Sequence, residues 1–375
     1  ATPTNGYTTT GLNSATTTIS VSYTYQGSGS TIYGPSATAP TAAGTYSITP
    51  SATFTVGSAS SYSSVTYTSS SFTINKAVLT ATPSGATATY GDSAPVYGIG
   101  VTGFKNSETT STAAGYVAPT CTSTYSATSA VGSSISYTCS GGSATNYTIT
   151  NSGSGSVVIS KATLTITPAG KSVTYGDPAP TYTFSVSGFK NGETTSTATS
   201  YSAPTCTSSY TTTTNVSASP LTITCTTPTT VTNYSFTSGS ANLTINKVTA
   251  LTVTASTQSA SYGASITSLY SNSAGFSSTG IGGGVINALT YTYAGSGSTT
   301  YAASTTAPSA PGTYSVTPSA VGFSTGSTGN YNAINYTAGT LTINSNALVI
   351  TANTVGPISY GDATPTNGYT TTGLN

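Results

Sequence analysis

The chain has 375 residues, of which only 3% are charged: six are lysine, five are acidic, and neither arginine nor histidine occurs. Because ordinary soluble domains carry about 25% charged residues, this composition excludes whole classes of function. The sequence offers no imidazole for a catalytic triad or a histidine-ligated zinc site, and no guanidinium for bidentate phosphate binding. Six scattered lysines cannot form the basic surface that nucleic-acid binding requires. We therefore expect no catalysis, no cofactor, no bound metal ion and no nucleic-acid partner.

The composition favours strands and turns over helices. Tyrosine is abundant, at 28 residues, and 40 glycines and 18 prolines are spread along the chain, as expected for a β-rich protein with many turns. No apolar run reaches the roughly 18 residues that would make a membrane-spanning helix. The sequence predicts an all-β protein with no membrane insertion in this segment.

A pattern of strand, turn and Tyr-Gly-Asp recurs along the chain. The motif occurs as Tyr90-Gly91-Asp92, Tyr175-Gly176-Asp177 and Tyr360-Gly361-Asp362, with Tyr262-Gly263-Ala264 as a variant. Its tyrosines are 85, 87 and 98 residues apart, and these are the lengths of single small domains. We interpret the motif as a turn in which the aspartate accepts backbone N–H bonds. The spacing of a DxDxDG calcium loop is absent.

These repeats divide the chain into five predicted segments. They are a β-sandwich domain lacking its first strand (1–75, the first repeat), two domains with a cysteine pair (76–160 and 161–246, the second and third repeats), a fourth domain (247–345, the fourth repeat) and the first strands of a further domain (346–375, the tail segment). Each last strand runs into the next first strand without a Pro/Gly/Ser linker, which predicts stiff joints. At about 3.3 Å per strand residue, four domains would span on the order of 150 Å.

Residues 1–13 and 363–375 are identical, so the sequence also repeats with an offset of 362 residues. Residues 348–362 supply an opening strand and a Tyr-Gly-Asp turn before the second copy, so we expect residue 1 to follow the opening strand of its own domain. Two explanations are open: a window on a long chain of such cassettes, or separate subunits that pass a strand head to tail, as in donor-strand complementation. We favour the long chain, because strand donation alone does not need thirteen residues twice. In both cases the expected partner is a further copy of the same sequence.

The third repeat shows the strand pattern most clearly. Strands are predicted at 164–167, 172–177, 182–189, 203–210, 221–226, 233–238 and 241–247, with 182–189 the clearest. About seven short strands without helical periodicity are typical of an immunoglobulin-like β-sandwich. Residues 193–200 could instead hold one helical turn, which would fit a β-grasp-like fold, but threonine is a poor helix former.

The four cysteines form two pairs with nearly equal spacing. Cys121 and Cys139 are 18 residues apart, and Cys206 and Cys225 are 19 apart. A zinc site would favour CxxC pairs and histidine, both of which are absent. We expect disulfides between neighbouring strands, each worth about 3 kcal/mol in the chain-entropy model, and hence an oxidising, extracellular location. Glu108 and Glu193, which lie near lysines in FKNSET and FKNGET, are read as surface-loop residues.

The stretch LTITPAGKSVTYGDPAPTYTFSVSGFKNGET, residues 164–194, resembles the MBG repeats of the YGX type, immunoglobulin-like repeats of very large bacterial surface and adhesin-like proteins. The resemblance implies a secreted array at the cell surface, and it transfers no catalytic, cofactor-binding or metal-binding residue. Our hypothesis is a structural repeat unit of a stiff extracellular bacterial fibre without catalysis. The alternative is an adhesin whose repeats bind glycans or surfaces.

Overall fold

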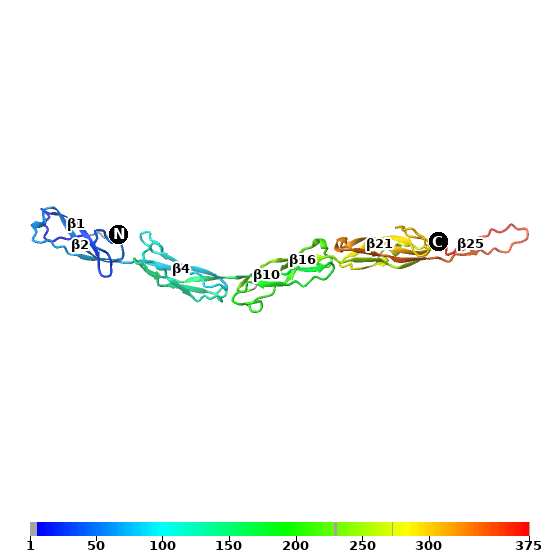
Figure 1. Ribbon diagram of the computed structural model, residues 1–375, viewed down its shortest axis with the longest axis horizontal. Helices are drawn as coiled ribbons and strands as arrows, with labels where there is room; N and C mark the ends of the chain where they lie inside the picture. The colour runs from blue at the N-terminus through cyan, green and yellow to red at the C-terminus, as the bar shows by residue number, and fades with distance from the viewer. Residues whose placement is uncertain (1–5, 229–230, 272, 375) are drawn as a thin grey trace. The chain divides into compact units, whose positions relative to one another are not determined.

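The computed structural model describes residues 6–228, 231–271 and 273–374, and its strands are drawn in Figure 1. These residues form strands β1 to β25 and short 3-10 turns, with no α-helix among them. The predicted all-β fold is therefore confirmed. Residues 193–200, the place of the alternative helical turn, contain a single turn in which the N–H groups of Thr197 and Ala198 both donate to the Thr194 carbonyl (3.2 and 3.0 Å). That is too little for the helix of a β-grasp-like fold.

The chain forms two compact units. One comprises Ala1–Thr163, Phe189–Ser200 and Val231–Ser235, and the other Leu164–Gly188, Tyr201–Thr230 and Phe236–Asn375. This division does not follow the predicted segment boundaries, which stay a prediction. Across the described ranges, no helix is long and apolar enough to cross a bilayer.

The first repeat contains one antiparallel sheet of three strands in the order β1-β2-β3. They are β1 (Thr18–Gly27), β2 (Gly44–Val56) and β3 (Ser70–Ile74). The 3-10 turn η1 (Ala59–Ser61) lies between β2 and β3. Tyr46 is 1% exposed and stacks on Phe72, with ring centroids 5.3 Å apart. Its hydroxyl donates to the Ala42 carbonyl four residues upstream (2.8 Å), as tyrosines do in the corners of immunoglobulin-like sandwiches.

The second repeat is organised by one long strand, β4 (Ala77–Thr89). Its other strands are β5 (Gly98–Thr102), β6 (Thr120–Ser123), β7 (Ile135–Ser140), β8 (Tyr147–Asn151) and β9 (Gly155–Ser160). The first half of β4 pairs antiparallel with β5 and parallel with β8, and its second half pairs parallel with β9. Gly85, at a φ of 100°, lies where the register shifts between the two halves. Leu79 in the first half is completely buried.

In the third repeat the segment that corresponds to β4 forms two separate strands, β10 (Ala162–Pro168) and β11 (Lys171–Thr174). The remaining strands are β12 (Phe184–Ser187), β13 (Cys206–Thr207), β14 (Leu221–Cys225), β15 (Tyr234–Ser238) and β16 (Ser240–Asn246), with 3-10 turn η2 (Val216–Ala218). They form sheets β12-β10-β15 and β11-β16-β14-β13. The strand predicted at 182–189 is shorter, because Gly188 takes a positive φ (101°) immediately after β12.

The fourth repeat has the same two sheets, β19-β17-β22 and β18-β23-β21-β20. Its strands are β17 (Leu251–Ala255), β18 (Gln258–Ser261), β19 (Phe276–Thr279), β20 (Val285–Gly295), β21 (Gly312–Thr325), β22 (Ile334–Thr337) and β23 (Gly339–Asn344), with 3-10 turns η3 (Thr267–Leu269), η4 (Ser273–Gly275) and η5 (Thr328–Asn330). Leu251 and Val253, which point from β17 into the core, are 0% exposed.

The tail segment forms an antiparallel hairpin of β24 (Val349–Ala352) and β25 (Tyr369–Thr372). Residues 7–10 of the first repeat have the same sequence as β25 but are not in a strand. Residues 1–5 and 375, which belong to the two copies of the thirteen-residue sequence, lie outside the described residues.

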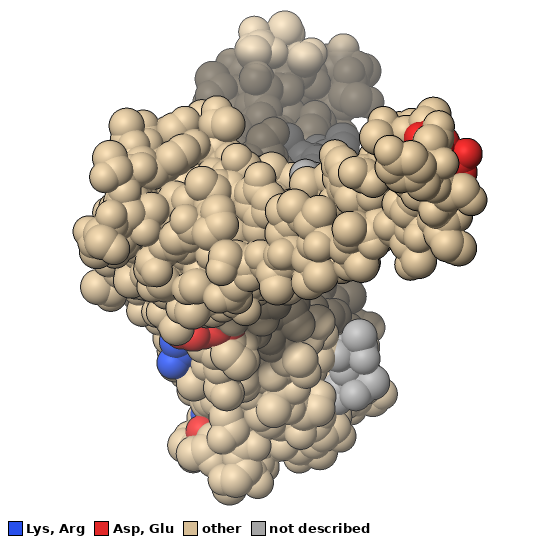
Figure 2. Space-filling model, turned by 90° about the vertical axis from the view of Figure 1, so that its right-hand side faces the viewer, with Lys and Arg blue, Asp and Glu red and all other residues tan. Residues whose placement is uncertain are grey.

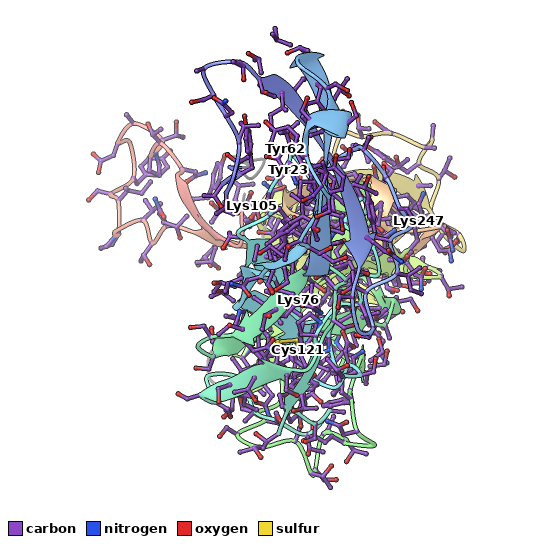
Figure 3. All side chains as sticks on the ribbon, turned by 90° about the vertical axis from the view of Figure 1, so that its left-hand side faces the viewer. Tyr23, Tyr62, Lys76, Lys105, Cys121 and Lys247 are labelled. Atoms are coloured by element: carbon purple, nitrogen blue, oxygen red, sulfur yellow. A yellow bond between two sulfur atoms is a disulfide. The ribbon has the colours of Figure 1, made fainter. Side chains whose placement is uncertain are left out.

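Both cysteine pairs are disulfide-bonded and lie directly opposite each other on antiparallel strands. Cys121 in β6 is bonded to Cys139 in β7, and Cys206 in β13 to Cys225 in β14. The first of these bonds is drawn beside the label of Cys121 in Figure 3. No free cysteine occurs in the described part of the chain.

Reduction should destabilise the second and third repeats by up to about 3 kcal/mol each, because each disulfide closes a loop in the unfolded chain. The fourth repeat contains no cysteine and is the internal control. Hydrogen exchange with and without reductant measures this repeat by repeat. An equal loss of protection in all three repeats would contradict the expectation.

Candidate functional site: the junctions between repeats

Charged side chains are rare on the surface, and the face shown in Figure 2 is almost entirely uncharged. No group of three or more Cys, Asp or Glu side chains that could hold a metal ion occurs in the described ranges. The polar and aromatic side chains with the most defined contacts instead lie where one repeat follows the next. These junctions are the candidate functional site.

An asparagine bonds to two repeats at each of three junctions. Its side-chain Oδ1 accepts a backbone N–H from the preceding repeat, and its backbone carbonyl accepts the N–H of the second residue of its own repeat. The side-chain bonds run from Ala43 to Asn146 (3.0 Å), from Val131 to Asn233 (3.0 Å) and from Val216 to Asn330 (2.9 Å). The backbone bonds run from Ala77, Ala162 and Val248, each at 3.0 Å. One residue thus satisfies donors from two repeats, and we call it the bridging asparagine.

The third bridging asparagine is the most buried. Asn330 is 0% exposed, and its Nδ2 donates to Oδ1 of Asn215 in the preceding repeat (2.8 Å). The first repeat has Ser61 and Tyr62 where the fourth repeat has Asn330 and Tyr331, so a serine takes the place of the bridging asparagine there. The Tyr62 hydroxyl donates to Thr17 of its own repeat (3.1 Å).

A tyrosine pair closes the junction between the second and third repeats. Tyr90 of the Tyr-Gly-Asp motif meets Tyr234 edge to face, with ring centroids 5.5 Å apart. The two hydroxyls donate to the two carboxylate oxygens of Glu193, Tyr90 at 3.1 Å. The Tyr234 hydroxyl also accepts the Lys190 N–H (2.9 Å). Both tyrosines are at most 4% exposed, so the pair is buried, and both hydroxyls are hydrogen-bonded.

The same junction carries an ion pair. Lys190 Nζ lies 3.1 Å from Asp92 Oδ1, with both side chains partly exposed. Gly91 has a φ of 86°, and a Cβ there would lie 2.3 Å from the Lys190 Cβ. Only glycine therefore allows this turn to approach the next repeat.

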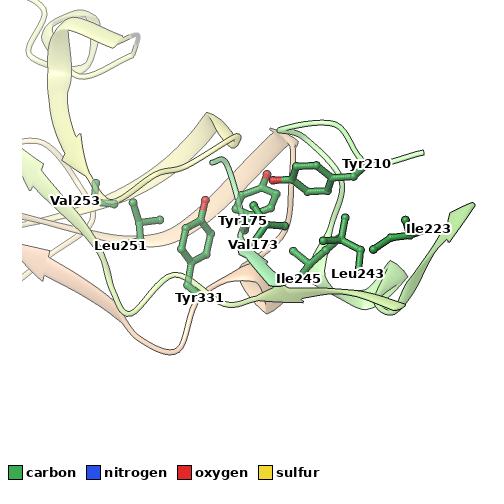
Figure 4. Packing of buried hydrophobic residues seen from close by; sticks show 9 residues of the cluster. All are labelled: Val173, Tyr175, Tyr210, Ile223, Leu243, Ile245, Leu251, Val253 and Tyr331. Carbon is green, nitrogen blue, oxygen red and sulfur yellow. The ribbon is translucent and has the colours of Figure 1, made fainter. Parts of the chain in front are cut away.

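The junction between the third and fourth repeats uses close backbone approach instead of charge. Tyr175 meets Tyr331 edge to face, with centroids 6.0 Å apart, inside the cluster of Figure 4. A Cβ on Gly176 would lie 2.4 Å from the Gly282 Cα, and one on Gly283 would lie 2.0 Å from the Thr212 carbonyl oxygen. The glycine run of the fourth repeat thus takes the place of the Lys-Asn-Gly-Glu loop of the third.

The second repeat contains a loop, Lys105 to Glu108, that corresponds to the Lys190 to Glu193 loop of the third repeat. Lys105 donates its N–H to the Tyr147 hydroxyl (3.0 Å), and that hydroxyl donates to Glu108 Oε2. The arrangement is that of Lys190, Tyr234 and Glu193.

The predicted turn motifs form turns in all three copies. The N–H of Asp92, Asp177 and Asp362 donates three residues back, to Thr89, Thr174 and Ser359 (3.0, 3.0 and 3.1 Å), and Gly91, Gly176 and Gly361 have positive φ. The aspartate accepts a backbone N–H at Asp362, from Ser359 (2.8 Å). At Asp92 the carboxylate contacts Lys190 instead, and Glu193 accepts tyrosine hydroxyls rather than lying free in a loop. The difference at Asp92 comes from the contact of the motif with the next repeat, whereas Glu193 also accepts the hydroxyl of Tyr234 in its own repeat.

Burial also changes the acidity of the junction tyrosines. It raises the pKa of Tyr234 to about 12, with the hydrogen bond to Glu193 adding to the effect. It raises the pKa of Tyr331 to about 12 as well, with the neighbouring Tyr175 contributing. These tyrosines stay neutral in the folded protein beyond the pH at which an exposed tyrosine ionises.

Comparison with known families identifies two parts of the chain. Residues 79–156 and 164–244 match the family model of the MBG domain (YGX type), so the resemblance predicted from the sequence is confirmed for these two adjacent repeats. The Tyr-Gly-Asp turns at Tyr90 and Tyr175 lie inside the matched segments. No curated protein matches the chain.

Replacing Asn330 by alanine should lower the free energy of unfolding by about 1–3 kcal/mol, because the Val216 N–H loses its partner in a buried site. Asn332→Ala is the matched control, since that side chain is exposed two residues away. Denaturant unfolding of both variants measures the difference. Equal stability of the two would contradict the role of the bridging asparagine.

Alkaline pH should loosen the junctions. An unfolded tyrosine ionises near pH 10, whereas Tyr234 and Tyr331 ionise near 12, so their contribution is complete below about pH 10 and is lost as the pH rises towards 12. Denaturant unfolding at increasing pH measures this loss. Tyr234→Phe should show a smaller alkaline decrease than Tyr360→Phe, whose tyrosine is fully exposed; identical decreases would refute the assignment.

Proposed function

We propose that this chain, with its two MBG domains, is a structural repeat unit of a stiff extracellular fibre on a bacterial cell surface, in which copies follow one another head to tail. It acts without catalysis and without a cofactor. The observation that carries this proposal is the bridging asparagine, which recurs at three successive junctions.

Stiffness has a physical basis in these contacts. A flexible linker lets two domains rotate independently. The junctions between the second and third and between the third and fourth repeats instead combine the two bonds of the bridging asparagine with further contacts between repeats. Rotation at the junction of the second and third repeats would separate Tyr90 from Tyr234 and leave the Glu193 carboxylate without one of its donors. Bending therefore costs hydrogen bonds and buried aromatic contact.

The disulfides and the low charge support the extracellular part of the proposal. Disulfides persist in oxidising compartments, and two are present. A surface with 3% charged residues responds little to ionic strength. Its six lysines and absent arginine leave trypsin-like proteases few positions to cleave.

The alternative of a glycan-binding or surface-binding adhesin draws on exposed apolar side chains. Ile32 and Val96 are 99% and 94% exposed in loops, where they are free to contact a ligand. Binding of the purified chain on a glycan array would support this alternative, and uniform absence of binding would leave the structural role.

Electron microscopy of the purified chain tests the stiffness directly. We expect straight particles of nearly constant length, on the order of 150 Å for four repeats. Asn330→Ala particles should bend at one position, and Asn332→Ala particles should stay straight. Flexible wild-type threads without preferred length would overturn the proposal.

A further inference from the structure

A well-ordered loop of the first repeat carries an apolar side chain at the surface. Ile32 lies on the loop between β1 and β2 and is 99% exposed. The Gly27 N–H donates to the Tyr33 carbonyl across the loop (2.8 Å). The ring of Tyr33 meets that of buried Tyr46 edge to face, with centroids 5.7 Å apart. The backbone around Ile32 is therefore held in place, so a partner that buries this side chain does not have to order a flexible loop. We call Ile32 the apolar knob.

The fourth repeat shows that this loop does not need an isoleucine. Its loop GSGSTTYAAS, residues 295–304, corresponds to GSGSTIYGPS, residues 27–36. The Gly295 N–H donates to the Tyr301 carbonyl (2.8 Å), and Tyr301 meets Tyr314 edge to face at 5.6 Å. Thr300, which is exposed, takes the place of Ile32. The same loop structure thus forms around a threonine, and the isoleucine is left without a role in folding.

The second repeat has an open groove with apolar walls beside β4. β5 pairs with β4 only as far as Gly85, which lies opposite Gly98. At this place a groove opens whose lining includes Pro95, Val96 and Val158. Val96 and Val158 are 94% and 58% exposed. None of the described residues that line the groove is charged. We call it the valine groove.

The third repeat shows that the fold does not need the residues of this groove either. At four lining positions the third repeat has a larger or more polar residue. The pairs, second repeat first, are Ala86 and Lys171, Val96 and Thr181, Gly98 and Thr183, and Val158 and Thr244. Single exposed apolar residues are ordinary, but these four differences lie in one groove and all make it wider or more apolar. A lysine on a strand edge also discourages pairing with other chains, and the second repeat has alanine there.

We propose that the apolar knob of one copy inserts into the valine groove of a second copy, with Ile32 between Val96 and Val158. Residues 27–36 contain no charged side chain, so neither surface has to remove a charge from water on contact. The inference goes beyond the proposed function, because this contact joins copies at a place other than the junctions. Each copy carries one knob and one groove, so the contact can recur from copy to copy. One such contact is small and therefore weak, and an array of copies multiplies it.

Methyl NMR of the purified chain, labelled in its isoleucine and valine methyl groups, tests the contact. As the protein concentration is raised, the signals of Ile32, Val96 and Val158 should shift together, whereas those of buried Ile166 should not shift. A mixture of an isoleucine-labelled and a valine-labelled preparation should give a nuclear Overhauser effect between Ile32 of one copy and Val96 of another. Signals that do not depend on concentration would overturn the proposal.

Threonine variants taken from the other repeats assign the contact. Ile32→Thr should weaken the association about tenfold or more, and should remove the concentration dependence of Val96, a residue that it does not alter. Val96→Thr should do the same to Ile32. Val78→Thr is the matched control, since Val78 is 57% exposed in the same repeat, lies outside the groove and corresponds to Thr163. All three variants should stay folded, because another repeat accommodates threonine at each position.

The remaining outcomes separate this contact from its alternatives. Val96 signals that still shift in Ile32→Thr, or that no longer shift in Val78→Thr, would overturn the proposal. Shifts of Val96 and Val158 that occur only on addition of a cello-oligosaccharide would also overturn it, and would support the adhesin alternative. Straight particles in the microscope combined with unchanged methyl signals would leave the stiff-repeat function standing and remove only this contact.

Discussion

The opening strand of the second, third and fourth repeats is the element on which the rest of their structure depends. In the second repeat the two halves of β4 belong to different sheets, so one strand holds both together. In the third repeat β10 lies in one sheet and β11 in the other, and in the fourth repeat β17 and β18 are divided between the two sheets in the same way. The parallel pairing with the last strand also ends at a fixed place: the N–H groups of Tyr90, Tyr175 and Tyr262 donate to the last strand's final residue, Ser160, Asn246 and Asn344. In these three repeats the Tyr-Gly turn therefore lies at the end of the repeat, beside the start of the segment that follows.

Once the turn is at the exit, two different chemistries make the junction. Between the second and third repeats, Lys190 and Glu193 use charge and hydroxyl bonds to hold the turn. Between the third and fourth repeats, Gly282 and Gly283 have no side chain, so their backbone lies directly against the backbone of the third repeat. Both solutions keep the same edge-to-face tyrosine pair, and aromatic pairs of this geometry add about 0.5–1.5 kcal/mol to the area they bury. The tyrosine pair is therefore the common part, and the charged residues are one way to support it.

Much of the fold could be predicted from the sequence, because alternation, turn residues and cysteine spacing are local signals. The strands of the third repeat, for example, follow from apolar residues such as Leu164 and Ile166 at every second position. The junctions could not, because Asp92 and Lys190 are 98 residues apart and each sits in a motif that alone indicates an ordinary turn. The recurrence of Asn-Tyr before the last strands, at Asn146, Asn233 and Asn330, is a signal that could have located the bridging asparagines. The parallel pairing of β4 with β8 has no local signature at all.

An uncovered opening strand is costly for a protein of this composition. Exposed apolar strand edges pair with other chains, and most proteins block them with charged residues, which this surface almost lacks. Leu348, Ile350 and Ile358, at 49%, 64% and 56% exposed, would each contribute about 1.5–3 kcal/mol on full burial, and partial exposure in the free hairpin reduces that gain. Even the reduced sum favours a covered strand over a free one.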